Sequence, residues 1–311
     1  MLRILFMGTP DFATACLKKL VETGNNIVGV VTQPDKAMGR GMKTGFSDVK
    51  KYALEMNLPI FQPTTLKDNA FLPELEQLKP DVIVVVAYGK ILPEYVLSYP
   101  KYGCVNVHGS LLPKYRGAAP IQRAVMNGDK VTGVTTMLMD KGLDTGDMLL
   151  KREYEIGENE NVGEVFDNLA AIGAELLLET LDGLEKGTLI PEKQDEAEAT
   201  HTEKISNEEC ELRFDESARS THNKIRALSP FPGAFCRHNG KILKIYESFV
   251  LGEEHDGTNG EIVRLDKQGI YVKCGKGTLV LTRLKPEGKG IMNAADLING
   301  RKVSLGEVLG K

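Results

Sequence analysis

The chain has 311 residues, of which 41% are hydrophobic and 26% charged, and its formal net charge is −4. This composition is typical of an ordinary soluble globular protein. The length predicts two domains, each large enough for its own core. No apolar run approaches the roughly 20 residues that cross a bilayer, and a predicted strand at 2–7 leaves no room for a signal peptide. We therefore expect a cytoplasmic protein without membrane contact.

The five cysteines are odd in number and contain no Cys-x-x-Cys pair, which predicts reduced thiols. The histidines lie apart along the sequence, and Cys236-Arg237-His238 is too tight for a common zinc site. We therefore expect no metal.

Residues 1 to about 140 alternate short apolar runs with helical patterns. The run at 81–87 is apolar without alternation, as expected for a parallel strand covered on both faces. These features predict an α/β protein with a doubly wound, mostly parallel, Rossmann-like sheet. The predicted strands are 2–7, 27–32, 59–61, 81–87, 104–108 and 131–139, and the predicted helices are 10–23, 47–56, 118–126 and 162–184.

The remainder of the chain has a different character. Residues 192–209 hold seven acidic and two basic residues and read as a linker over the surface. Ser206 and Glu209 form a capping-box signal, and a helix is expected at 215–228. Alternating segments at 241–246, 260–265, 269–274 and 278–284, separated by glycines, predict a small OB-like β-barrel. The predicted division is therefore a domain at 1–189, a linker at 190–205 and a second domain at 206–311.

Charge is distributed unevenly between the two halves. Residues 209–311 hold 17 Lys and Arg against 13 Asp and Glu, whereas residues 1–208 hold 22 against 30. A carboxy-terminal half at +4 attached to a half at −8 is consistent with a polyanionic partner. Ordinary surface variation explains the charge equally well.

Three polar residues form a candidate site. Asn106 and His108 stand two apart where a strand runs into a turn, so their side chains point to the same side. Asp144 follows the next predicted strand, and ligands of open α/β sheets bind beyond strand ends, so we expect Asp144 to reach His108. In an acyl-transfer centre the amide donates to a developing oxyanion, the imidazole moves a proton and the carboxylate orients the imidazole. No Ser or Cys nucleophile is needed if the substrate brings its own amine.

Other sites are not supported. The first strand ends in Gly8-Thr9-Pro10, with one glycine where a dinucleotide fingerprint has three. Asp144-Thr145-Gly146 occurs once, whereas an aspartic protease needs two such aspartates.

The longer motif around this site carries a resemblance. Asn106-Val107-His108 is followed by Ser110-Leu111-Leu112-Pro113-Lys114-Tyr115-Arg116-Gly117, and an Asp-x-Gly-Asp turn starts 36 residues after His108. This combination resembles the folate-dependent formyltransferases, which move a formyl group from 10-formyltetrahydrofolate to an amine. The resemblance implies that Asn106, His108 and Asp144 are catalytic. It also implies that the folate is contacted by Ser110, Leu111, Leu112 and Pro113, and by Tyr88, Gly89, Ile91 and Leu92 of the segment 86–93.

Two further stretches point to the acceptor. Residues 36–51 hold five Lys and Arg against one Asp, in a connection that needs only about 2 to 6 residues. Residues 225–235 are similar to the carboxy-terminal domain of formylating enzymes. These stretches resemble the family members that formylate initiator methionyl-tRNA for translation initiation. The resemblance implies that Arg40 and Lys43 contact the tRNA, that residues 206–311 bind it, and that the protein acts as a monomer.

Three alternatives stay open. The acceptor could be another amine, such as an amino sugar or glycinamide ribonucleotide, although the basic loop and the basic carboxy-terminal half favour tRNA. The enzyme could hydrolyse formyl-folate. The chain could also be a tRNA-binding module without catalysis, which the intact set of Asn106, His108 and Asp144 makes improbable.

Overall fold

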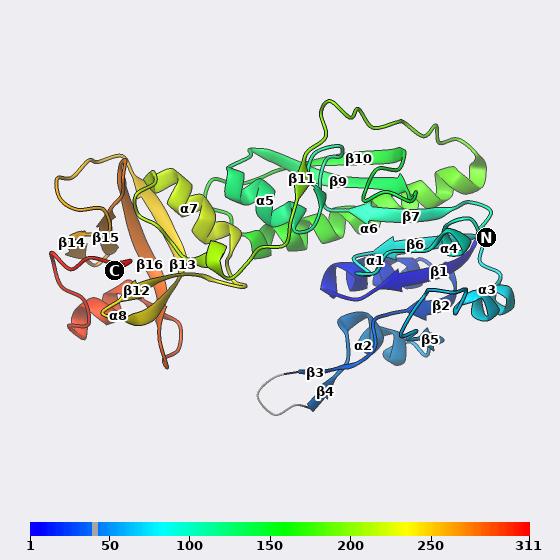
Figure 1. Cartoon of the computed structure of the whole chain (residues 1–311), viewed down its shortest axis with the longest axis horizontal. Helices are drawn as coiled ribbons and strands as arrows, with labels where there is room; N and C mark the ends of the chain where they lie inside the picture. The colour runs from blue at the N-terminus through cyan, green and yellow to red at the C-terminus, as the bar shows by residue number, and fades with distance from the viewer. Residues whose placement is uncertain (39–42) are drawn as a thin grey trace. The chain divides into compact units, whose positions relative to one another are not determined.

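The computed structural model describes the backbone of residues 1–38 and 43–311, and the side chains of residues 1–35 and 45–311 (Figure 1). The chain forms two compact units. The amino-terminal unit comprises Met1–Gly117, Gly133–Tyr154 and Phe166–His201. The carboxy-terminal unit comprises Ala118–Thr132, Glu155–Val165 and Thr202–Lys311. The boundaries drawn from sequence at 189 and 206 stay a prediction.

A seven-stranded sheet organises the amino-terminal unit. Its strands are β1 (Arg3–Gly8), β2 (Asn26–Val31), β5 (Ile60–Phe61), β6 (Val82–Val86), β7 (Cys104–His108), β9 (Val131–Leu138) and β10 (Met148–Glu155). The order is β10-β9-β7-β6-β1-β2-β5. β1 pairs in parallel with β2 and with β6, and β6 pairs in parallel with β7, which confirms the Rossmann-like parallel sheet.

One strand of this sheet departs from the parallel direction. β9 is antiparallel to β7, with Asn106 opposite Met137 and His108 opposite Thr135. The end of β9 therefore lies beside the start of β7, and the following loop must fold back to bring Asp144 toward His108. The sheet was predicted to be mostly parallel, and β9 is an antiparallel member of it.

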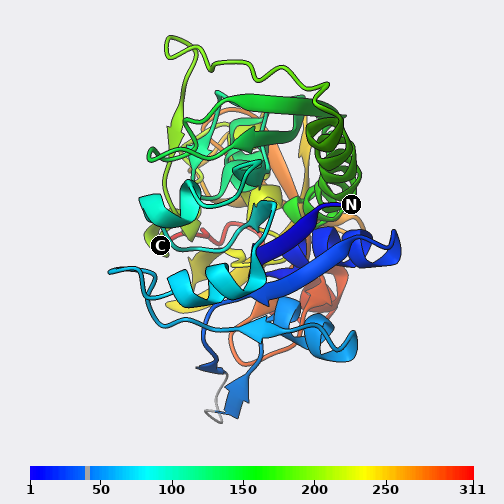
Figure 2. The same ribbon diagram turned by 90° about the vertical axis from the view of Figure 1, so that its right-hand side faces the viewer.

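Helices cover both faces of the sheet. They are α1 (Asp11–Glu22), α2 (Asp48–Glu55), α3 (Leu72–Leu78), α4 (Glu94–Leu97) and α6 (Val162–Lys186). Leu5 and Met7 of β1 belong to one buried cluster with residues of α3 and α4. On the other face, the Phe12 ring of α1 lies 5.3 Å from the Phe166 ring of α6. Figure 2 shows α1 and α6 on one side of the sheet and the cyan helices on the other.

Between β2 and α2 the chain forms a hairpin of β3 (Lys36–Met38) and β4 (Lys43–Gly45), which pair in antiparallel fashion (Figure 1). Near its base, Lys50 Nζ pairs with Asp35 Oδ2 at 2.5 Å and donates to Gln62 Oε1 at 2.8 Å. Arg40, one of the two residues expected to bind tRNA, lies outside the described residues. Lys43 lies in β4, and its side chain is outside the description.

The carboxy-terminal unit contains a mostly antiparallel sheet around its own core. The strands follow the order β12-β13-β16-β15-β14, and a short β17 pairs with β16. Ile245, Ile270 and Leu281 are fully buried there. The elements of this unit are α5 (Pro120–Asn127), η1 (Glu208–Cys210), α7 (Ala218–Ala227), β12 (Ala234–His238), β13 (Lys241–Leu251), β14 (Ile262–Asp266), β15 (Gly269–Lys273), β16 (Thr278–Pro286), β17 (Met292–Asn293) and α8 (Ala294–Asn299).

The predicted barrel is not confirmed. The strand path begins at β12 and ends at β14, and within the described residues no pairing joins these two end strands. The capping box is confirmed, because Glu209 Oε2 accepts from Ser206 N at 2.9 Å and Ser206 Oγ accepts from Glu209 N at 3.3 Å. None of the helices that the structure describes is long and apolar enough to span a membrane.

Candidate active site

The structure brings Asn106, His108 and Asp144 together in the amino-terminal unit. Asp144 Oδ1 lies 3.4 Å from Asn106 Nδ2, and Asp144 Oδ2 lies 3.7 Å from His108 Nδ1. The two β7 residues are buried, with 9% of Asn106 and 7% of His108 exposed. Both distances are longer than an ideal hydrogen bond, so the carboxylate faces the amide and the imidazole without a short hydrogen bond to either.

The ring of His108 is fixed from its other side. Its Nε2 lies 3.0 Å from the carbonyl oxygen of Tyr115. A carbonyl oxygen can only accept a hydrogen bond, so Nε2 must carry the proton of this contact. Nδ1 is thereby the nitrogen that faces Asp144, and it carries a proton only when the ring is positively charged. The arrangement therefore places Nδ1, and not Nε2, against the carboxylate.

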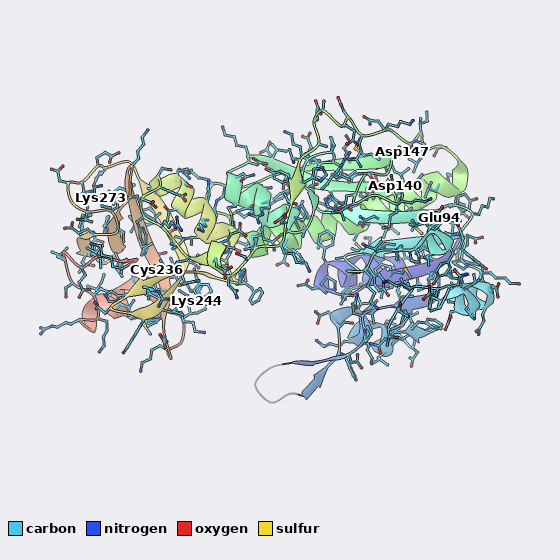
Figure 3. All side chains as sticks on the ribbon, viewed as in Figure 1. Glu94, Asp140, Asp147, Cys236, Lys244 and Lys273 are labelled. Atoms are coloured by element: carbon cyan, nitrogen blue, oxygen red, sulfur yellow. The ribbon has the colours of Figure 1, made fainter. Side chains whose placement is uncertain are left out.

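A backbone N–H group holds the Asp144 carboxylate in place. Gly117 N donates to Asp144 Oδ2 at 2.8 Å, from the short strand β8 (Arg116–Gly117). Asp144 itself has a positive φ of 55°, a conformation that is unfavourable for a residue with a side chain. Its loop is braced further by Asp140, whose Oδ1 accepts from Gly142 N at 2.9 Å and from Thr145 Oγ1 at 2.7 Å (Asp140 is labelled in Figure 3).

A second contact to this loop comes from a distant part of the sequence. Gln194 Nε2 donates to the carbonyl oxygens of Asp144 and Gly146, each at 2.8 Å. Arg116 Nε donates to Gln194 Oε1 at 2.9 Å. The segment that reads as a linker therefore contributes to this site. It is held to the same unit by two backbone hydrogen bonds of 2.8 Å between Glu192 and Met148.

The loop expected to contact folate is stabilised by two hydroxyl groups, one from Thr135 of β9 and one from Ser110 in the loop itself. Thr135 Oγ1 donates to Ser110 O at 2.7 Å and accepts from Leu112 N at 3.1 Å, while Ser110 Oγ donates to Lys114 O at 2.7 Å. The side chains of Ser110 and Leu112 are almost fully buried, and Pro113 is buried as well. Ser110 and Leu112 therefore have backbone rather than side-chain groups to offer a ligand, whereas Leu111 is half-buried.

The second expected folate segment follows β6. Ile91 is 88% exposed, while Leu92 and Tyr88 are buried and Gly89 is exposed. Burial raises the pKa of the Tyr88 hydroxyl to about 12, so it stays protonated. The Tyr88 carbonyl accepts from Gln33 Nε2 at 2.9 Å and from Thr9 Oγ1 at 3.3 Å, which ties this segment to the ends of β1 and β2.

Sequence reasoning did not identify Thr135, Arg116 or Gln194 as parts of the site. Arg116 stands inside the quoted motif, so that motif could have flagged it. Thr135 is an inward-facing residue of a strand, and Gln194 lies in a polar stretch with no local signal. Across the described residues, no group of three or more His, Cys, Asp or Glu side chains could hold a metal ion. The expectation of an enzyme without metal stays a prediction.

The fold and the site define the class of protein. The family model described as "Formyl transferase" matches residues 2–181, and "Formyl transferase, C-terminal domain" matches residues 204–302. Among solved structures, an N-formyltransferase from Helicobacter canadensis has 19% identity and a TM-score of 0.68, over 90% of this chain and 98% of that one. HypX from Aquifex aeolicus has a TM-score of 0.67 at 18% identity, over 98% of this chain and 48% of that one. The chain is a formyl transferase by family and fold.

The curated relatives narrow the assignment. A methionyl-tRNA formyltransferase of Caldanaerobacter subterraneus is 49% identical over 99% of this chain and 100% of its own length. One from Clostridioides difficile is 45% identical, with the same coverage of both chains. The chain therefore belongs to the methionyl-tRNA formyltransferase family.

Proposed function

We propose that this protein transfers the formyl group of 10-formyltetrahydrofolate to the α-amino group of methionine on initiator methionyl-tRNA, for translation initiation in the cytoplasm. The observation that carries the proposal is the convergence of Asn106, His108 and Asp144 in a chain with full-length relatives of that name. Two solved formyltransferase-fold proteins are described as complexes with folinic acid and with tetrahydrofolic acid. These complexes support a folate donor. We assign catalysis to residues 1–189, connected through 190–205 to tRNA binding by 206–311 in a monomer.

The residues around the site fit a folate. Ligands of doubly wound sheets bind beyond the carboxyl ends of the strands, and residues 87–92 follow the carboxyl end of β6. Ile91 there presents an apolar side chain that is 88% exposed, and Leu143 beside Asp144 is 63% exposed. Covering such side chains with an aromatic ring system removes apolar surface from water. The backbone N–H and C=O groups of residues 110–113, which Thr135 holds in place, can form hydrogen bonds with polar edges of the ligand.

The chemistry follows from the three polar side chains. The donor supplies a carbonyl carbon that an amine can attack, so negative charge develops on the formyl oxygen. Asn106 has a second N–H besides the one that faces Asp144, and it donates that N–H to the oxygen. His108 in its charged form lies beside the same position and supplies positive charge, while Asp144 stabilises the imidazolium. The amine attacks in its neutral form and gives up a proton as the new C–N bond forms. The bond from the formyl carbon to N10 of the folate then breaks, and N10 leaves with a proton to give tetrahydrofolate. The fixed geometry contributes by holding the reactants together.

We assign recognition of the tRNA to residues other than the three catalytic ones. Arg40 and Lys43, in the inserted basic stretch, contact the acceptor end of the tRNA through its phosphates or splayed bases. The carboxy-terminal half, with its net charge of +4, adds less specific affinity for the tRNA body. We extend this proposal to an OB-like binding surface on the sheet of β12 to β16, since OB-type surfaces bind oligonucleotides.

Acceptor competition tests the proposal. Radiolabelled 10-formyltetrahydrofolate is offered with methionyl-tRNA, with an amino sugar nucleotide, with glycinamide ribonucleotide, or with water alone. The proposal requires label on methionyl-tRNA at a rate at least about 100-fold above the other three. Faster transfer to an amino sugar or to glycinamide ribonucleotide identifies another formyltransferase, and release of formate alone identifies a hydrolase.

A further inference from the structure

The backbone of the Asp144 loop is held in a conformation that needs external support. Asp144 has a φ of 55°, and Gly146 two residues later is packed so closely that a Cβ would lie 1.7 Å from the carbonyl oxygen of Leu138. The carboxylate must nonetheless stay within 3.4 to 3.7 Å of Asn106 and His108. A small rotation of this loop would separate the carboxylate from both partners.

Gln194 supplies that support from outside the loop. Its single amide nitrogen donates to the carbonyl oxygens of Asp144 and Gly146, each at 2.8 Å, so both N–H groups are used on the loop backbone. These two carbonyls bracket Thr145 and fix the turn on either side. Gln194 touches the backbone of Asp144 and not its carboxylate.

A buried arginine in turn orients Gln194. Arg116 is only 1% exposed and donates through Nε to Gln194 Oε1 at 2.9 Å. Its other two nitrogens donate to both oxygens of Glu196, at 2.9 and 2.8 Å. Such a bidentate pair fixes the plane of the guanidinium group. Because Nε of this fixed group donates to Gln194 Oε1, the amide oxygen of Gln194 must face Arg116 and its nitrogen must face the loop. Gly117, which holds the Asp144 carboxylate, is the next residue along β8.

Gln194 lies in the stretch between the two regions that the family models match, residues 2–181 and 204–302. Its place in the polar stretch gives no sign of a role, whereas the contacts tie it to the centre of the site.

We propose that Gln194 is a positioning residue for formyl transfer, which acts by holding the backbone of Asp144, and that Arg116 sets its orientation. This inference rests on the proposed function. It assigns to the stretch between the two matched regions a part in catalysis, in addition to joining the two domains.

Two variants of the full chain test the proposal. Gln194→Met keeps the length of the side chain and removes its donors, and Gln194→Glu keeps the acceptor for Arg116 while placing oxygens against the two carbonyls. Either change should lower kcat for formyl transfer to methionyl-tRNA by roughly 10- to 100-fold, as expected for a displaced catalytic group. KM for both substrates should change less than about threefold. Lys193→Met, at an exposed neighbouring position, is the control and should keep wild-type kcat.

A double-mutant cycle separates positioning from general structural support. If Gln194 acts through the charge of Asp144, adding Gln194→Met to Asp144→Asn should lower kcat by less than about twofold further. An effect of Gln194→Met that persists at full size in the Asp144→Asn background overturns the proposal. So does a kcat within twofold of wild type in both single variants, or a failure of both to fold by circular dichroism. A wild-type chain inactive on methionyl-tRNA would instead overturn the proposed function.

Discussion

Nδ1 of His108 faces Oδ2 of Asp144 at 3.7 Å, although 36 residues separate them and the intervening strand β9 runs antiparallel to β7. The carboxylate is held from its other side by Gly117 N at 2.8 Å, and the imidazole by the carbonyl of Tyr115 at 3.0 Å. Both side chains are therefore held in place by backbone groups of one short segment, residues 115–117. Such preorganisation suits the catalytic roles that we propose for His108 and Asp144.

Removing the negative charge of Asp144 should strongly lower kcat for formyl transfer. Asp144→Asn keeps the size of the side chain but removes the negative charge beside His108, and we expect kcat to fall by roughly 10²-fold or more. Steady-state kinetics with methionyl-tRNA measures it. Asp140→Asn is the matched control, since its Oδ1 can still accept from Gly142 and Thr145, and it should stay within about threefold of wild type. Equal losses in the two variants would mean that the loop, and not the charge of Asp144, matters.

Asn106→Ala should lower kcat by roughly 10²- to 10³-fold, the usual loss when an oxyanion donor is removed. Folate affinity, measured by fluorescence titration, should change little, because the variant leaves intact the segments 88–92 and 110–113 to which we assign folate binding. A folded variant with near-normal turnover would remove Asn106 from the catalytic set.

Thr135→Val should weaken folate binding. The valine cannot accept from Leu112 N or donate to Ser110 O, so the loop 110–113 loses two hydrogen bonds and leaves a buried N–H unpaired. An unsatisfied buried group costs about 1 to 3 kcal/mol, equivalent to a Kd roughly 5- to 150-fold weaker if the cost falls on the binding-competent loop. Isothermal titration measures the Kd. Thr135→Ser restores the hydroxyl and should restore affinity, and a valine variant that binds as well as the serine variant would refute this role.

Arg40→Ala and Lys43→Ala should act on tRNA alone. Each removes a positive charge that we assign to the acceptor stem, so kcat/KM for methionyl-tRNA should fall and its salt dependence should become shallower. KM for the folate donor should stay constant. Parallel losses for both substrates would indicate that the basic stretch supports the fold of the site instead.

His222 of α7 should make the carboxy-terminal unit sensitive to acid. Burial lowers the pKa of its imidazole from 6.5 to about 4, against the smaller opposing effect of the hydrogen bond between Nε2 and Glu158 O. Its folded-state pKa is depressed, so the neutral ring contributes stability that is present above pH 6.5 and lost as pH falls toward 4. The shift corresponds to about 3 kcal/mol. Calorimetry should show a steeper fall of Tm over this range for wild type than for His222→Gln, and equal slopes would contradict it.

Local patterns in the sequence predicted the parallel strands of the sheet. They also predicted that two of the candidate site residues lie on the same side of one strand. The unbroken apolar run at 81–87 predicts a strand buried on both faces, and β6 is such a strand. The spacing of Asn106 and His108 places both on one side of β7. The position of Asp144 was expected from motif and chain order, but the direction of β9 depends on pairing between distant strands, which no local pattern records.

The remaining features depend on tertiary contacts. Alternating strands have the same pattern in an open sheet and in a closed barrel, so the sequence could not decide between them for β12 to β16. Gln194 lies among acidic and small residues typical of a linker, and its role depends on Arg116, 78 positions earlier. A contact of that range leaves no periodicity in the sequence.

The proposed reaction consumes one formyl-folate for each methionine that it formylates, and a single-turnover experiment measures both. In a single turnover with enzyme in excess, quenched at successive times, tetrahydrofolate and formyl-methionyl-tRNA are measured in the same sample. We expect the two products to appear at the same rate and in a ratio of about one to one, and we expect Asn106→Ala and Asp144→Asn to slow both together. Tetrahydrofolate that forms at the same rate without methionyl-tRNA, with the label released as formate, would contradict the proposed reaction.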